Sequence, residues 1–366
     1  MQYTHLSIYI KMNYNLRNKL SLLAIASVVM TSCSGQKAVL KTPIATTQPA
    51  QTSDIATKYM NTITADELKT HLYIVASDEM QGRNTGEEGQ KKAGRYLIEQ
   101  YKKNDIPFPT GATDFYQAIP ASYFSKAFSP KLGDSENIWA FIEGSEKPEE
   151  ILVISAHYDH VGMKNGEVYN GADDDGSGTV ALLEIAQAFQ KAKKEGNGPK
   201  RSILFLHVTG EEHGLHGSRY YTENPLFPLA NTITDINIDM IGRRDDLHNA
   251  TNNYVYVIGS DYLSSDLYNV CEEANKESVN IDLDYKFNDR NDPNRFYYRS
   301  DHYNFAKNNI PSVFLFNGVH ADYHQASDEP NKIEYDALQK RTQLAFAIAW
   351  KLANKKDRPK VDKSGN

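Results

Sequence analysis

Six short apolar runs, each rich in β-branched or aromatic residues, alternate along the chain with stretches of helical periodicity. The runs cover residues 137–142, 151–156, 203–209, 233–239, 254–258 and 312–316. Helical patterns cover residues 64–76, 86–103, 177–191, 264–277, 302–308 and 335–354. Strands that alternate with helices form largely parallel sheets that are covered on both faces. We therefore expect the α/β class, as a three-layer α/β/α sandwich with a central mixed, mostly parallel sheet.

The first 32 residues have the layout of an export signal. Three basic residues and no acidic residue come first, then the apolar run 20–30, which is too short to span a bilayer, and then small residues. The run ends in Met30-Thr31-Ser32-Cys33, which resembles a bacterial lipobox; an ordinary signal peptide with an incidental cysteine is the alternative. We expect residues 1–32 to be a lipoprotein signal peptide and Cys33 to be lipidated, which would place the protein in the bacterial cell envelope.

The rest of the chain divides by composition. Residues 33–53 are rich in Thr, Ala, Gln and Pro without periodicity, and we expect a flexible tether there. Residues 54–355 leave no room for an inserted domain, so they predict a single domain, and residues 356–366 predict a basic frayed tail. The net charge of −7, with no long basic block, argues against a nucleic-acid partner. We expect membrane contact only through the lipid at Cys33, and the oligomeric state stays open.

Metal-type side chains stand at or near the ends of the predicted strands, where α/β sheets place their functional residues. The first such segment ends in His157-Tyr158-Asp159, where residues two apart point to the same side of an extended chain. A carboxylate at Asp159 can hold one nitrogen of the His157 imidazole while the other nitrogen binds a metal. A core histidine beside a surface aspartate would give the same pattern.

Two further segments are more acidic. Asp173, Asp174 and Asp175 lie in one Gly-rich loop, where they repel one another unless a cation neutralises them or the loop is simply solvated. Glu211-Glu212 follows a predicted strand and Gly210, and adjacent residues diverge, so one carboxylate can bind a metal while the other serves as general base. A surface pair that caps a helix is the alternative.

Two more segments complete the series. Asp239 ends an apolar strand, where a buried carboxylate calls for a cation partner unless it simply reaches the surface. His324 lies in the loop after the last strand, between Asp322 and Asp328. Each segment is weak evidence alone, but five in this order are specific.

These segments carry a family resemblance. HYDHVG, GADDDGSG, EEHGLHGS, NIDMIG and YHQASDEP together resemble the dizinc exopeptidase family of bacterial leucyl-type aminopeptidases, metallopeptidase family 28. Glutamate carboxypeptidase and the transferrin receptor are more distant members. The resemblance extends over about residues 65–355 and implies the zinc-exopeptidase, phosphorylase/hydrolase-like fold.

The resemblance also implies residue roles and two Zn²⁺ per chain. His157 and Asp239 would bind one zinc, Glu212 and His324 the other, and Asp174 would bridge the two. Glu211 would be the general base and Asp159 the partner of His157. Residues Tyr298, Arg299, Ser300 and Asp301 match a segment that borders the substrate pocket in relatives. His160 has no place in the ligand set that the resemblance implies.

The resemblance points to an aminopeptidase that hydrolyses the N-terminal bond of a peptide substrate. Three rivals stay open: a glutaminyl-cyclase-like enzyme with one zinc, a carboxypeptidase of the same family, and a receptor-like binding module without catalysis. A carboxypeptidase would need arginines that converge on the terminal carboxylate of the substrate. The complete ligand set argues against the receptor-like module.

Overall fold

The computed structural model describes residues 50–127, 129 and 131–364. The predicted signal peptide, Cys33 and most of the predicted tether lie outside these residues. The described residues belong to one compact unit. Among them, no helix combines the length and the apolar character that crossing a membrane requires.

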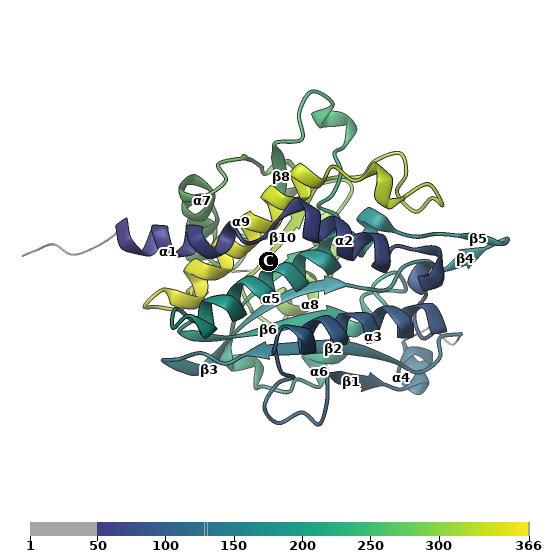
Figure 1. Ribbon diagram of the computed structural model, residues 1–366, viewed down its shortest axis with the longest axis horizontal. Coiled ribbons are helices and arrows are strands. Elements are labelled where there is room, and N and C mark those ends of the chain that lie inside the picture. Colours follow the sequence, from purple (N-terminus) through teal and green to yellow (C-terminus); the bar gives the residue numbers. More distant parts are fainter. Residues whose placement is uncertain (1–49, 128, 130, 365–366) are drawn as a thin grey trace, which may run out of the picture. The chain divides into compact units, whose positions relative to one another are not determined.

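An eight-stranded sheet forms the centre of the described structure (Figure 1). Its strands, in spatial order, are β1 (Tyr116–Ile119), β2 (Ser135–Ile142), β6 (Arg201–Val208), β3 (Lys147–His157), β7 (Thr232–Ile238), β10 (Ser312–Phe316), β8 (Tyr254–Ile258) and β9 (Asp282–Asp284). The four central strands, β6, β3, β7 and β10, run parallel to one another. β2 pairs with β1 and β6 in antiparallel register, as β8 does with β10, whereas β9 is parallel to β8. A separate hairpin joins β4 (Met163–Lys164) to β5 (Glu167–Val168).

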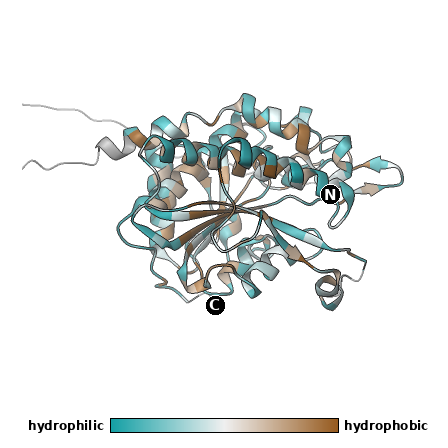
Figure 2. Cartoon of the chain, turned by 60° about the horizontal axis from the view of Figure 1, so that its bottom comes forward, coloured by the Kyte–Doolittle hydropathy of each residue, from teal (hydrophilic) through white to brown (hydrophobic). Residues whose placement is uncertain are grey.

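Helices cover both faces of the sheet, as expected from the sequence (Figure 2). They are α1 (Ala50–Met60), α2 (Ala65–Val75), α3 (Glu88–Lys103), α4 (Ala121–Lys126), α5 (Gly178–Lys194), α6 (His216–Glu223), α7 (Ser265–Glu277), α8 (His302–Ala306) and α9 (Tyr335–Asn354). On one face, α5 and α9 pack on β3 and share a core with α2, α3 and α7. On the other face, α8 packs on β7 and β10, and α6 packs on β1 and β2. The three-layer α/β/α arrangement is therefore confirmed.

The central strands are buried on both sides, which explains their sequence. Every residue of β6 and β7 is buried, and so is β3 from Ile151 to His157. A strand covered on both faces can read as a continuous apolar run, as β3 and β6 do over most of their length. β7 instead intersperses its isoleucines with buried polar residues, among them Asp235 and Asn237. This burial leaves only the strand ends free to carry chemistry.

Two expected boundaries differ from the structure. Helix α1 begins at Ala50, inside the range predicted as tether, so the ordered chain starts before residue 54. The tail after α9 is held to the surface rather than frayed: the Arg358 guanidinium donates to the carbonyls of Ala230 and Thr232, at 3.0 and 3.1 Å. The Asp362 amide donates to the Leu263 carbonyl. Composition alone indicated a free tail because it does not reveal these long-range backbone partners.

Candidate metal centre

The predicted metal residues meet at one edge of the sheet because four neighbouring strands run in the same direction. His157 is the last residue of β3, and Asp239 follows directly after β7. Glu211 and Glu212 come shortly after β6, and His324 lies in the connection that follows β10. Carboxyl ends of parallel strands share one edge of a sheet, so residues distant in sequence converge there.

The first group consists of His157, Asp174 and Asp239, whose ligand atoms all lie within 4.8 Å of one another. Nε2 of His157 lies 3.2 Å from Oδ1 of Asp174 and 3.6 Å from Oδ1 of Asp239. The other ring nitrogen, Nδ1, lies 3.0 Å from the backbone carbonyl oxygen of Asp159. With Nδ1 donating to that carbonyl, Nε2 is left as the lone-pair nitrogen that faces the two carboxylates.

The second group consists of His160, Asp174 and Glu212, and their ligand atoms also lie within 4.8 Å of one another. Asp174 therefore belongs to both groups, in the bridging position that the family resemblance implies. Nε2 of His324 lies 3.0 Å from Oδ2 of Asp174 and 3.0 Å from Oε2 of Glu212. The structure thus brings all five predicted ligands together and adds His160, which the sequence analysis left out.

The loop that carries Asp174 is fixed by its neighbours in sequence. The Asp173 carboxylate accepts the Gly242 amide at 2.6 Å and contacts Nε2 of His320 at 3.0 Å. The Asp175 carboxylate accepts the amides of Gly178 and Met240. These two acids therefore shape the backbone and leave Asp174 facing both groups.

Asp328 and Arg83 hold the same loop from outside. The Asp328 carboxylate accepts the amides of Asp173 and Asp174 at 3.0 to 3.2 Å. The buried Arg83 guanidinium donates to the carbonyls of Tyr158, Asn170 and Gly171, and also to that of Val75. Arg83 therefore connects the end of β3 to the start of the Asp174 loop.

Asp159 contacts His157 through both its side chain and its backbone. Its carboxylate Oδ1 lies 3.8 Å from Nδ1 of His157, beyond hydrogen-bond distance, because the ring bonds to the carbonyl group instead. The carboxylate accepts the Thr85 hydroxyl at 2.8 Å and the Glu211 amide at 3.2 Å. Asp159 therefore orients His157 through its backbone and Glu211 through its side chain.

The protonation equilibria of the site reflect an excess of negative charge. Burial opposes the charged form of Asp174, but contacts with His157 and His324 outweigh it and bring its pKa well below the usual range. Burial lowers the pKa of His324, yet contacts with Asp174 and Glu212 outweigh it and raise that pKa to about 10. Without metal, a proton would thus take the place of a cation between the two carboxylates.

Glu211 has the opposite shift. Burial raises its pKa well above the usual value, and the carboxylates of Asp239 and Glu212 add to this, against the opposing effect of His157. A carboxylate with a raised pKa accepts protons more readily, which suits a general base.

The four residues predicted to border the substrate lie in different places. Tyr298 is 40% exposed and stacks beside Arg295, whereas Arg299 lines a pocket with Asp174 and Glu211. Ser300 and Asp301 are buried and do not line that pocket.

Both buried residues of that segment act inside the protein. The Ser300 hydroxyl donates to Oδ2 of Asp239 at 2.6 Å and accepts a hydrogen bond from the side-chain amide of Asn237 at 2.7 Å. Ser300 therefore orients a predicted metal ligand. The Asp301 carboxylate accepts the Ser218 hydroxyl, and burial raises its pKa to about 7. Sequence matching placed this segment near the site but could not give the direction of each side chain.

A pocket opens beside the metal residues. Three carboxylates, those of Asp174, Glu211 and Asp239, border it, and its other walls are Met240, Phe296, Arg299, Phe314, Phe316, Val319 and Tyr323. Four of these residues also line an adjoining hollow of about 400 Å³.

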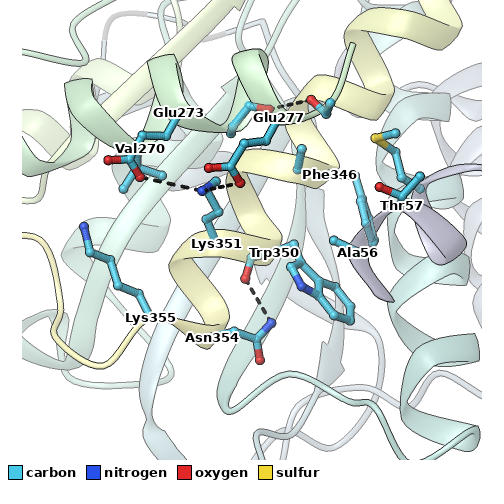
Figure 3. A pocket seen from close by; sticks show the side chains of 14 residues that line it. Ala56, Thr57, Val270, Glu273, Glu277, Phe346, Trp350, Lys351, Asn354 and Lys355 are labelled. Atoms are coloured by element: carbon cyan, nitrogen blue, oxygen red, sulfur yellow. Dashed lines mark hydrogen bonds and ion pairs between the residues drawn. The ribbon is translucent and has the colours of Figure 1, made fainter. Parts of the chain in front are cut away.

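Another pocket, of about 260 Å³, lies between α1, α7 and α9 and shares no lining residue with the metal site (Figure 3). Lys351 lines this pocket, and its Nζ lies 3.6 Å from a Glu273 carboxylate oxygen and 2.8 Å from a Glu277 carboxylate oxygen.

Curated relatives match part of this chain. The vacuolar membrane protease of Emericella nidulans is 34% identical over 103 residues, which are 28% of this chain and 10% of that protein. Aminopeptidase NAALADL1 of Rattus norvegicus is 36% identical over 112 residues, which are 30% of this chain and 14% of that protein. The matched region thus spans only a small part of the length of these relatives.

Solved structures share the fold. The LapA aminopeptidase of Legionella pneumophila has a TM-score of 0.64 at 19% identity, covering 87% of this chain and 79% of its own. The zinc aminopeptidase BSAP of Bacillus subtilis has a TM-score of 0.59 at 17% identity, covering 82% of this chain and 98% of its own. A glutaminyl cyclase of Bacteroides thetaiotaomicron has a TM-score of 0.62 at 17% identity, covering 79% of this chain and 98% of its own.

The sequence pattern of peptidase family M28 matches residues 137–349, more than half of the chain. That range contains the ends of the four parallel strands and the loops that carry the two groups. The chain therefore belongs to peptidase family M28.

Proposed function

We propose that this protein is an aminopeptidase that holds two zinc ions per chain and removes N-terminal residues from peptides. One observation carries the proposal: two groups of ligand atoms converge on the shared residue Asp174, next to the half-buried Glu211, which lines the same pocket. Such paired sites suit hydrolysis by an activated water, because both the nucleophile and the carbonyl oxygen need positive charge.

The residues present fit zinc. Imidazole nitrogens and carboxylate oxygens are the ligands that zinc commonly takes. Oε1 of Glu212 and Oδ2 of Asp174 are buried and have no hydrogen-bond partner among the described residues. Unsatisfied buried carboxylate oxygens are costly, so a cation at this position explains them.

Each protein group has a task in the proposed reaction. Two bound zinc ions would supply Lewis-acid chemistry, which polarises a peptide carbonyl and lowers the pKa of water. Glu211 would take a proton from the attacking water and deliver it to the amine of the leaving peptide. The Asp159 carboxylate, bonded to the Glu211 amide, keeps this base at the pocket floor.

The pocket supports an apolar N-terminal residue as the preferred substrate. Phe296, Phe314 and Phe316, together with Met240, offer aromatic and aliphatic surface beside the three carboxylates. An apolar side chain would gain about 25 cal/mol per Å² of surface that it buries there. Glu211, the pocket carboxylate that is not assigned to zinc, would be free to contact the free amino group of a peptide, whereas an N-blocked peptide lacks that charge.

A panel of substrates tests the function. We expect the purified protein to hydrolyse leucyl- and phenylalanyl-p-nitroanilide, to leave N-acetylated versions intact, and to lose activity in a chelator until zinc is added back. Cleavage of N-blocked peptides from their C-terminus would instead establish a carboxypeptidase.

The cyclase alternative differs in its metal content. A glutaminyl-cyclase-like enzyme would bind one zinc per chain and release no free amino acid. We expect elemental analysis to give two zinc ions per chain, because His157, Asp174 and Asp239 form a group of their own. One tight zinc per chain, with cyclisation of glutaminyl peptides, would refute the aminopeptidase.

We also propose that the protein is exported and anchored by a lipid on Cys33. The support is the sequence alone: a basic start, a short apolar run and small residues before Cys33. We expect the full-length chain to sediment with bacterial membranes and the Cys33→Ala variant to be released. An unchanged distribution of that variant would contradict the anchor.

A further inference from the structure

His160 is held rigidly at the metal site. Its side chain is fully buried, and its amide donates to the Arg83 carbonyl at 3.2 Å. Gly171 lies against the ring: a Cβ atom there would come within 2.5 Å of the His160 Cγ and Cδ2 atoms. Gly171 also has a φ of +52°, a conformation that favours glycine. The backbone thus leaves space for the ring and determines where it lies.

The nitrogen Nδ1 of His160 points into the second group. It lies 2.7 Å from Oε1 of Glu212 and 3.8 Å from Oδ2 of Asp174. These three buried atoms lie at ion-pair distance from neighbouring groups, yet none of them makes a hydrogen bond of normal geometry among the described residues. One imidazole nitrogen and two carboxylate oxygens therefore converge, and each of these atoms can offer a lone pair. This is the arrangement expected around a shared cation.

Other buried histidines differ from His160. Nε2 of His207 bonds to the Tyr101 hydroxyl at 2.6 Å, and although its Nδ1 has no partner, no carboxylate among the described residues lies within ion-pair distance of the ring. His302 also lacks hydrogen bonds, but it packs against Tyr297 and Phe314, and no carboxylate among the described residues lies within ion-pair distance of it. A packing role therefore accounts for His302, whereas His160 faces two carboxylates.

We infer that His160 is itself a ligand of the metal held by Asp174 and Glu212. The inference rests on the proposed metal function and adds a residue to the five implied by the family resemblance. His324, the predicted ligand of the same metal, has a side chain that is 36% exposed. His160 would bind the metal from the buried side, so this position would keep its ion even when the exposed histidine moves.

A crystal structure of the zinc-loaded protein tests the inference directly. We expect Nδ1 of His160 at about 2.0–2.1 Å from the zinc ion, the usual zinc–imidazole distance. A zinc bound only by Asp174, Glu212 and His324, with Nδ1 donating a hydrogen bond to Glu212, would overturn it.

Variants give a second readout that does not depend on activity. Full-length protein would be stripped with chelator and titrated with zinc in a calorimeter. We expect His160→Asn to weaken the binding of one zinc ion by well over 100-fold, beyond the roughly 10–100-fold that the loss of an orienting residue costs, and to leave the binding of the other ion unchanged. Asparagine can still donate a hydrogen bond to Glu212 but is a poor zinc ligand, so a purely orienting role predicts two ions bound as tightly as in the unmodified protein.

His71→Asn is the matched control, since His71 also contacts a buried glutamate, with Nε2 3.3 Å from Oε1 of Glu184. We expect it to bind both ions normally. Two ions of unchanged affinity in His160→Asn would refute the ligand role alone. Fewer than two ions in the unmodified protein would instead refute the proposed dizinc function.

Discussion

Glu211 and Glu212, shortly after the end of β6, face different surroundings. Glu212 faces His160, His324 and the shared Asp174, whereas Glu211 borders the pocket lined by the three carboxylates, and its amide donates to the Asp159 carboxylate. Gly210, with a φ of +68°, makes the bend that separates them. At the scale of residues, metal binding and proton transfer should therefore be separable by mutation.

Replacement of Glu211 by glutamine should abolish proton transfer and leave the metals in place. We expect kcat to fall by about 10²–10⁴-fold, because an amide cannot act as general base. Elemental analysis should still give two zinc ions per chain. Full activity of Glu211→Gln would refute the assignment.

Ser300→Ala tests the residue that orients Asp239. It removes the 2.6 Å bond from the Ser300 hydroxyl to Oδ2 of Asp239. We expect the zinc bound by Asp239 to weaken by about 10–100-fold, as for other residues that orient ligands. Calorimetric titration would measure this, and an equal loss at both ions would show a general change in folding instead.

The sequence predicted which residues meet but not how each one acts. His157, Glu212 and Asp239 stand at or near the ends of predicted strands, which share one edge of a parallel sheet. The choice of Asp174 and His324 as further ligands came from the family resemblance. His160 was not among the predicted ligands, because side chains alternate between the two sides of the chain only within a strand, and β3 ends at His157. Beyond the strand, the chain places the His160 ring beside Glu212. The side-chain bonds of Asp159 depend on Thr85 and Glu211, which no local pattern reveals.

At the scale of elements, long apolar segments were predictable and short polar ones were not. β8, β10 and α9 have the bounds expected from their patterns. β1, β9 and α4 were not predicted, because each has six or fewer residues and depends on its neighbours for stability. Edge strands of this kind carry little pattern of their own.

Helix α9 is connected to the sheet by one buried arginine. The Arg341 guanidinium donates to the carbonyls of Ile241, Arg243, Asn252 and Tyr254. These carbonyls lie in the segment between β7 and the start of β8.

Arg341→Met should therefore destabilise the protein. Several buried carbonyl groups would lose their donor, and we expect a loss of about 3–5 kcal/mol in the free energy of unfolding. Arg358→Ala is the control, since its exposed hydrogen bonds to the tail partners should be worth about 1 kcal/mol or less. Denaturant titration of both variants would show whether burial decides the difference.

At the scale of the whole molecule, bound metal ions should raise the free energy of unfolding. Three carboxylates, of Asp174, Glu212 and Asp239, converge at one edge of the sheet, and they repel one another without a cation. A ligand at 100 times its dissociation constant adds about 2.7 kcal/mol to the stability of the folded state. We therefore expect chelation to lower the melting temperature and zinc to restore it; an identical melting curve with and without chelator would contradict this.

Zinc binding should also release protons. In the metal-free protein, nearby carboxylates raise the pKa of His324 to about 10, so its imidazole keeps a proton at pH 7. Zinc binds only the deprotonated ring, and its affinity should therefore rise with pH up to that value. Calorimetry in buffers of different ionisation enthalpy would count the released protons, and a buffer-independent heat would contradict the prediction.

The bonds made by Arg83 bear on where a working fragment of this protein can begin. The M28 match starts at residue 137 and includes every side chain that we assign to zinc. Yet Arg83 lies well before that start, and its guanidinium donates to the carbonyls of Tyr158, Asn170 and Gly171. A clone trimmed to the matched range would encode all the metal-binding residues and lack the group that sets their spacing.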